Sequence, residues 1–138
     1  MLDSPIHLIH RVAQSATDLF EGRKKGNLTA RQAAVLAAVA ADEGLNQTQI
    51  VEKTGVDRST LADVVRRLVR KGLLQRHRTK ADARAYAVKV TVAGRKALQA
   101  AELLAKKVDT QLLSALPSRE KTQFVAALRA IIEAEKAA

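Results

Sequence analysis

The sequence predicts a mainly α-helical fold that carries one small β-hairpin, and three observations support this. Between residues 58 and 71, apolar side chains recur every three or four positions, as they do on a half-buried helix. Two short runs follow, 73–78 and 85–90, and they have the character of extended, paired strands. Aromatic residues make up only 2% of the chain, so the core must consist of Leu, Val, Ile and Ala, which suit helix–helix contacts.

The segment around the periodic helix has the pattern of a helix-turn-helix. Asp57 precedes the helix, where its carboxylate can accept a free backbone N–H, and Gly72 follows the last turn. A shorter helix comes before it, with Asn46 and Gln49 at the spacing of a capping box, and Gly55 allows the sharp turn between the two helices. This pattern alone leaves open an ordinary two-helix corner in an α-helical core.

The hairpin that follows makes a DNA-binding surface the favoured interpretation. From residue 58 to residue 84, basic residues outnumber acidic ones by nine to two, and a polar, basic loop at 79–84 joins the two extended runs. A basic hairpin placed directly after such a helix is a wing, and an arginine at its tip can enter the minor groove, where the potential is most negative. The alternative is a solvated hairpin with incidental charge, which the combination with the preceding helix disfavours.

An ordered set of short motifs extends this interpretation. Along the chain they are Leu28-Thr29-x-x-Gln32-x-x-Val35-Leu36, Gly55-Val56-Asp57-Arg58-Ser59-Thr60-Leu61, Leu68-Val69-Arg70-Lys71-Gly72-Leu73-Leu74, Asp82-x-Arg84 and Thr91-x-x-Gly94-Arg95. With these motifs, residues 28–98 resemble the MarR family of winged-helix transcription regulators. The resemblance implies that Arg84 reaches the minor groove from the wing and that Asp82 helps to hold it.

The chain departs from the family pattern at two places. Ala62 and Asp63 stand where the family often has a polar or basic pair in the recognition helix. Lys80 replaces the proline commonly found before the aspartate of the wing. For this reason no operator sequence is carried over from the family.

The resemblance and the charge pattern together predict the residues that contact DNA. Ser59, Thr60 and Asp63 are predicted to face base edges, and the basic residues around them are predicted to bind mainly phosphates. Asp63 either accepts from a cytosine amino group or pairs with Arg66 and Arg67. The complete predicted set is Arg58, Ser59, Thr60, Asp63, Arg66, Arg67, Arg70, Arg76, Arg78, Lys80, Asp82 and Arg84.

Composition points to the same class of partner. A net charge of +10 and a pI near 10.4 favour a polyanion, with double-stranded DNA ahead of a membrane or an acidic protein. Single-stranded RNA fits less well, because few aromatic side chains are available to stack on bases. The chain has no cysteine, which excludes disulfides, thiolate zinc sites and cysteine-oxidation switches. No long apolar span or signal sequence is evident, so the protein is expected to be soluble and cytoplasmic.

The remaining helices are predicted at 4–23, 29–42, 92–115 and 118–135, and the candidate caps of the first three are Ser4, Thr29 and Thr91. They carry more apolar surface than one small domain can cover. Residues 1–24 and 95–138 are therefore assigned to a helical dimerisation region, and residues 28–94 to the winged-helix lobe, of a single MarR-like domain spanning 1–138. A two-fold homodimer is expected to read a palindromic operator. A compact monomeric bundle is the alternative.

The first helix also carries candidates for ligand binding. Two histidines lie at i, i+3 near Asp3, but no third ligand is evident, so neither a metal nor a cofactor is predicted. Because ligands in the resembled family often lodge between the dimer helices and the DNA-binding lobe, a pocket for a small anionic or aromatic effector is predicted instead. Its candidate residues are His7, His10, Arg11, Ser15 and Arg31.

No catalytic motif is present in the sequence. It contains no glycine-rich phosphate loop, no Gly-x-Ser-x-Gly elbow and no His-Glu-x-x-His helix, and the Asp42-Glu43 pair is interpreted as a solvated helix end. The predicted function is therefore a non-enzymatic one: a sequence-specific transcription regulator, a homodimeric repressor released by a small-molecule effector. A sequence-indifferent architectural or nucleoid-associated DNA-binding protein is the main alternative. A protein-interaction module without a DNA role is a third, which the dense arginines disfavour.

Overall fold

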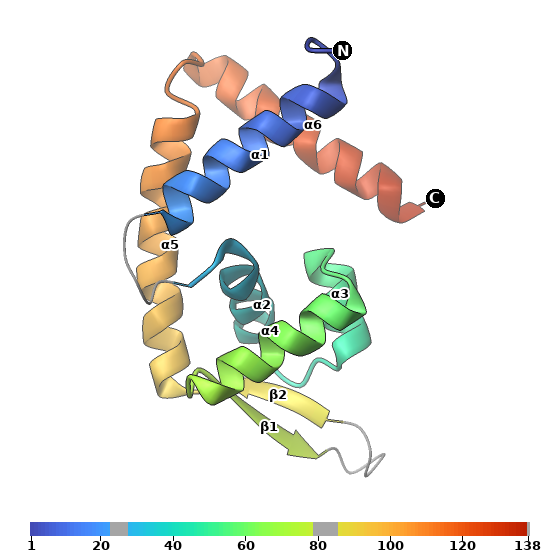
Figure 1. The fold of residues 1–138 in the computed structure, drawn as a ribbon, viewed down its shortest axis with the longest axis vertical. Helices are drawn as coiled ribbons and strands as arrows, with labels where there is room; N and C mark the ends of the chain where they lie inside the picture. Colours follow the sequence, from blue (N-terminus) through green and yellow to red (C-terminus); the bar gives the residue numbers. More distant parts are fainter. Residues whose placement is uncertain (23–27, 79–85, 138) are drawn as a thin grey trace.

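The computed structural model of the 138-residue chain describes residues 1–22, 28–78 and 86–137. Within them the elements follow the order α1 (Pro5–Glu21), α2 (Ala30–Ala41), α3 (Gln47–Thr54), α4 (Arg58–Arg70), β1 (Leu74–Arg78), β2 (Tyr86–Val90), α5 (Val92–Leu112) and α6 (Ser118–Ala137). The predicted fold class, mainly α with one small antiparallel hairpin, is confirmed (Figure 1).

Two parts of the molecule differ in how they pack. The lobe, which comprises α2, α3, α4, β1 and β2, surrounds a common hydrophobic core, and α5 runs along one side of it (Figure 1). The end helices, α1 and α6, lie on the side away from the hairpin (Figure 1). All of the largest completely enclosed side chains belong to the lobe, and they are Leu36, Ile50, Leu61, Leu68, Leu74, Val35, Val39 and Val65.

Side-chain caps fix where the helices of the lobe begin. Thr29 caps α2 and Asn46 caps α3, each in a full capping box with the glutamine three residues later. Asp57 caps α4 and Thr91 caps α5 through the backbone N–H of the third following residue. These four predicted caps are confirmed.

The predicted side-chain cap of α1 is wrong. Ser4 occupies the position before the helix with an extended backbone, but its side chain accepts no hydrogen bond from the first turn. Pro5 follows it, and because proline presets the helical φ and has no N–H to satisfy, the helix begins there without a cap.

Some element ends also differ from their predictions. Helix α1 ends at Glu21 rather than residue 23, α2 at Ala41 and α5 at Leu112, whereas α6 continues to Ala137. Helix α5 stops three residues early because Leu113, at φ −98° and ψ 10°, leaves the helical conformation.

The Asp42-Glu43 pair is more than a solvated helix end. The Asp42 carboxylate lies 3.7 Å from Lys53 Nζ on α3, and Glu43 Oε1 lies 2.6 Å from Arg95 Nη2 on α5. All four side chains are substantially exposed, so each ion pair contributes at most about 1 kcal/mol. Together they connect the end of α2 to the two helices beside it.

The hairpin is held against both the lobe and α5. Its register pairs Leu74 with Val90 and Arg78 with Tyr86, and Leu74, Val88 and Val90 are buried in the core. At the junction with α5, the Thr91 hydroxyl donates to the Gly72 carbonyl at 2.6 Å, and the Thr91 backbone N–H donates to the Leu73 carbonyl at 3.1 Å. These bonds fix the base of the hairpin to the start of the long helix.

Gly94 allows this junction to be tight. It is buried in the first turn of α5, and a Cβ at this position would overlap the Leu73 carbonyl oxygen and press on the Val90 side chain. Glycine is therefore required here by close approach and not by backbone conformation.

The end helices bury no residue completely. Helix α1 exposes Ile6, Ile9 and Val12, and α6 exposes Val125, Leu128, Ile131 and Ile132. Exposed apolar side chains on both helices are what the sequence predicted. Among the described residues, no helix is both long enough and apolar enough to cross a membrane.

Candidate nucleic-acid interface

Helix α4 separates an apolar face from a charged one. Leu61, Val64, Val65 and Leu68 point into the core and anchor the helix on the lobe. The other face is exposed, and its polar residues are Arg58, Ser59, Asp63, Arg66, Arg67 and Arg70. Because the core fixes the apolar face, the helix presents the charged face outward as a rigid surface.

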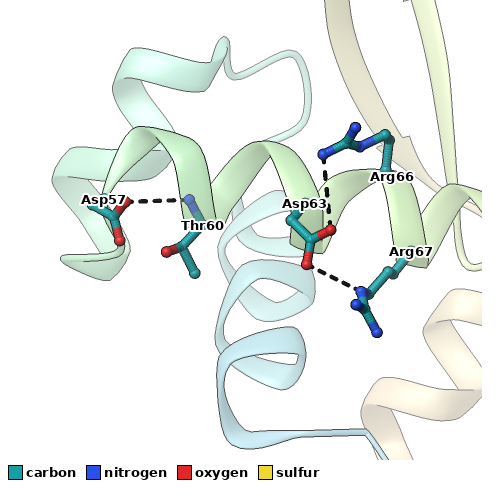
Figure 2. A network of polar contacts seen from close by, with 5 residues as sticks. All are labelled: Asp57, Thr60, Asp63, Arg66 and Arg67. Atoms are coloured by element: carbon teal, nitrogen blue, oxygen red, sulfur yellow. Dashed lines mark hydrogen bonds and ion pairs between the residues drawn. The ribbon is translucent and has the colours of Figure 1, made fainter.

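The first turn of this helix is organised by one carboxylate. Asp57 Oδ2 accepts a 2.7 Å hydrogen bond from the Ser59 hydroxyl and a 3.2 Å bond from the Thr60 backbone N–H, the second of which is drawn in Figure 2. Hydrogen bonds from Thr60 and then Ser59 lower the pKa of Asp57 from 3.8 to about 2. The carboxylate is therefore ionised at neutral pH, and the Ser59 hydroxyl is oriented by it.

Arg58 braces the two helices of the motif against each other. Its Nη2 donates a 2.9 Å hydrogen bond to the Thr48 hydroxyl on α3, so its guanidinium lies across the turn between the helices. Arg58 remains exposed and available to a phosphate. Thr48 was not predicted from the sequence, because the spacing of two residues ten positions apart does not indicate such a contact.

The middle of α4 carries a three-residue ion cluster, shown in Figure 2. Asp63 Oδ2 accepts from Arg67 Nε at 3.0 Å, and Asp63 Oδ1 lies 3.8 Å from Arg66 Nη2. Of the two roles predicted for Asp63, pairing with these arginines is therefore the one adopted in the free chain. The spacings i, i+3 and i, i+4 place all three side chains on the same face.

The strand beside α4 extends the basic surface. Arg76 and Arg78 occupy alternate positions of β1 and are exposed, while His77 between them is half-buried opposite Ala87. The predicted contacts at the tip of the wing, Lys80, Asp82 and Arg84, lie outside the described residues.

The predicted effector residues divide into two groups. Arg31 lines a hollow of about 430 Å³ between α1, α2 and α4, together with Thr17, Glu21, Thr60 and Arg67. The other four, His7, His10, Arg11 and Ser15, lie nearer the start of α1 and do not line it; His7 is half-buried and the rest are exposed.

The residues of this hollow that were not predicted as effector residues come from all three helices, and two of them, Thr17 and Glu21, lie near the end of α1. Glu21 Oε2 accepts a 3.3 Å hydrogen bond from the Ala30 backbone N–H, which ties the end of α1 to the start of α2. Helical spacing could have indicated Thr17 and Glu21, because they continue the face that carries His10. The hollow also reaches α4 through Arg67, so it borders the charged face directly.

A second hollow, of about 370 Å³, lies between α1, the end of α4 and α5. It is mostly apolar and is lined by Phe20, Leu28, Lys71, Leu73, Ala97, Ala100, Ala101 and Leu104. No predicted effector residue lies in it.

Comparisons with known proteins agree on one family. The MarR family model matches residues 27–85. The transcriptional regulator HosA of Escherichia coli O157:H7 is 34% identical over 103 residues, which are 75% of this chain and 76% of HosA. The solved structure of the PcaV transcriptional regulator from Streptomyces coelicolor with its natural ligand is similar at a TM-score of 0.88 and 32% identity, covering 98% of this chain and 96% of PcaV.

A further solved structure bears on regulation. It is that of Bordetella bronchiseptica BpsR, whose DNA binding is regulated by 6-hydroxynicotinic acid. It has a TM-score of 0.89 and 26% identity to this chain, and the similarity covers 95% of this chain and 94% of BpsR.

Proposed function

This chain belongs to the MarR family of transcription regulators, and on that premise we propose that it is a homodimeric repressor that binds a palindromic operator in the cytoplasm and is released by a small effector. The chain is a DNA-binding regulator and not an enzyme. The observation that most supports the finer proposal is the rigid, exposed basic face of α4 with Arg76 and Arg78 beside it.

In the proposed complex, the first turns of α4 enter the major groove. Ser59, Thr60 and Asp63 face base edges there, and the arginines of α4 and β1 bind phosphates on either side. The proposed phosphate contacts are Arg58, Arg66, Arg67, Arg70, Arg76, Arg78 and Lys80. Arg84, held by Asp82, enters the minor groove; this part of the proposal rests on the family resemblance and on the charge of the loop.

A homodimer is supported by the distribution of burial. Among the described residues, the buried apolar side chains other than Ala101 and Val108 lie between residues 28 and 90, whereas α1 and α6 leave most of theirs exposed. A two-fold mate that covers these helices would bury apolar surface that water now contacts. Each Å² of buried apolar surface would stabilise the dimer by about 25 cal/mol. The proposed division is therefore a lobe at 28–94 and a dimerisation region at 1–24 and 95–138.

The effector we propose is a small aromatic acid. The hollow between α1, α2 and α4 is lined by two guanidinium groups, Arg31 and Arg67, and by two carboxylates, Glu21 and Asp63, and its volume of about 430 Å³ suits a small ring. An anionic ring would therefore pair with Arg31 and take the place of Asp63 on Arg67. BpsR, which is regulated by the aromatic acid 6-hydroxynicotinic acid, has the same fold. An anion that engages Arg67 would also draw that side chain away from a phosphate.

The decisive experiment measures the binding of the purified protein to selected and scrambled duplex DNA across a salt series. A repressor should prefer one palindromic sequence by at least about a thousandfold, and its affinity should fall steeply with salt. Arg70→Gln should weaken both duplexes alike and reduce the salt slope by about 0.9. Arg119→Gln, the same change on α6, should alter neither. Equal affinity for both duplexes would contradict the repressor and favour an architectural protein.

Dimerisation is tested separately by sedimentation. Ile131→Asp places a charge at an apolar position of α6 that is 58% exposed in the single chain, so it should convert the dimer to a monomer. Ala130→Asp, at a position about 100° from Ile131 around the helix and outside the arc of Val125, Leu128, Ile131 and Ile132, should leave the dimer intact. A wild-type protein that sediments as a monomer at micromolar concentration would contradict the proposed dimer.

A further inference from the structure

Asp63 is the single acidic residue of α4, and it stands among the arginines proposed to face DNA. Its carboxylate holds Arg67 at 3.0 Å and Arg66 at 3.8 Å, so two cations of the basic face are engaged by one anion (Figure 2). The three side chains are 52%, 62% and 58% exposed in the order Asp63, Arg67, Arg66. The cluster is thus open to whatever approaches the helix.

A carboxylate at this place opposes general DNA binding. Phosphates repel it, and so do guanine and thymine, which present mainly acceptor atoms in the major groove. Cytosine presents an amino donor there, which is the base-edge group that Asp and Glu accept from. Exposed ion pairs are weak, so a competing donor can displace an arginine from the carboxylate.

We propose that Asp63 determines the sequence specificity of DNA binding by exchanging its partners. In the free protein and on unrelated DNA, its carboxylate retains Arg66 and Arg67. At the operator, a cytosine amino group takes their place on the carboxylate, and the two arginines pass to phosphates. This inference rests on the proposed function, because it assumes that α4 occupies a major groove.

The exchange would limit non-specific binding. A chain of net charge +10 would otherwise bind any DNA strongly. Holding two arginines away from phosphates lowers the affinity for unrelated sequences. Releasing them at a matching base pair restores that affinity only at the operator. Asp63 therefore increases the ratio of the affinity for the operator to the affinity for unrelated DNA.

The first test is selection from a pool of random 30-base-pair duplexes by the wild type and by three variants. The wild type should select a C·G pair at one symmetric position in each half-site. Asp63→Ala should lose that preference, and Asp63→Asn should shift it toward adenine, which asparagine recognises through its N6 and N7 atoms. Asp109→Asn is the matched control, because it removes the same charge from an exposed position on α5.

The second test compares affinities for the selected and scrambled duplexes. Asp63→Asn should tighten binding to scrambled DNA and lower the ratio of selected to scrambled affinity about tenfold, whereas Asp109→Asn should leave the ratio unchanged. Arg67→Gln should have little effect on scrambled-DNA binding in the wild type but a clear one in the Asp63→Asn background, where Arg67 is free.

Two outcomes would overturn the inference, and they are distinguishable. If the wild type selects a palindrome and both Asp63 variants select the same bases with the same ratio, the exchange is wrong and the repressor stands. If the wild type selects no sequence at all, the proposed function fails and the exchange fails with it.

Discussion

The lobe and the end helices use the same kind of amphipathic helix with opposite results. Helices α2 and α4, with 12 and 13 residues, each bury four side chains, whereas α1 and α6, with 17 and 20 residues, bury none. Length and periodicity are therefore not what separates them. A helix buries its apolar stripe only where the same chain supplies a facing surface. For α1 that surface is small, since Phe20 is its only residue that packs against the core, and α6 buries no side chain. The core of the lobe is thus formed within the chain, whereas in the proposed dimer the end helices would gain their facing surface from the partner.

The largest expected effect comes from matched leucines in the two parts. Leu36→Ala removes a completely buried side chain of α2 and should lower the free energy of unfolding by about 2–5 kcal/mol. Leu128→Ala removes a side chain of α6 that is 40% exposed and should cost less than about 1 kcal/mol in the single chain. Urea unfolding at several protein concentrations measures both.

The dependence on protein concentration further distinguishes the two leucine variants. The effect of Leu128→Ala should grow with protein concentration if a dimer forms, because association adds its free energy to the folded state. The effect of Leu36→Ala should not grow in the same way. Equal losses for the two variants at low concentration would show that the end helices are stabilised within the chain after all.

The junction between the hairpin and α5 should give the next largest effect. Gly94→Ala would favour a helix by about 1 kcal/mol on propensity alone. Because the new Cβ would overlap the Leu73 carbonyl oxygen, we expect a net loss of about 1–3 kcal/mol instead. Thermal unfolding gives the sign directly, and a raised Tm would mean that the hairpin is not packed this closely on α5.

Helix caps provide a smaller contrast between the two parts. Asn46→Ala removes one half of the capping box of α3 and should cost about 1 kcal/mol. Ser4→Ala should cost almost nothing, since the Ser4 side chain caps no N–H of α1. The urea midpoints of the two variants, compared with that of the wild type, measure both losses of stability. A loss for Ser4→Ala as large as that for Asn46→Ala would show that Ser4 does cap α1.

The sequence predicted those features that residues close together in the chain determine. The stripe of α4 and the caps at Thr29, Asn46, Asp57 and Thr91 follow from neighbours within a few residues, and all were predicted. The bonds between Arg58 and Thr48 and between Arg95 and Glu43 join residues 10 and 52 positions apart. No spacing rule reports such contacts, because they depend on how whole helices pack.

The candidate site shows the same division. The basic face of α4 was predicted from its period and charge, and the choice of Asp63 between two roles was left open because both fit one helix face. The hollow beside it was missed in part, since Thr17 and Glu21 meet Arg31 and Arg67 only after α1, α2 and α4 have packed. Residues on one helix are predictable as a group, and residues from three helices are not.

The smallest expected effect concerns pH and isolates the first turn of α4. The pKa of Asp57 is lowered from 3.8 to about 2 in the folded chain, so its ionised form stabilises the fold. That contribution should be complete above about pH 4 and should be lost as the pH falls toward about 2, where the folded-state carboxylate takes up its proton.

Asp57→Asn is the matched variant, because asparagine can still cap the helix but does not titrate. Urea midpoints of the wild type and this variant, measured from pH 5 to pH 2, remove the contribution of every other carboxylate by difference. The wild type should lose more stability than the variant over this interval. Parallel curves would mean that the pKa of Asp57 is the same in the folded and unfolded chain, and that the hydrogen bonds from Ser59 and Thr60 do not favour its ionised form.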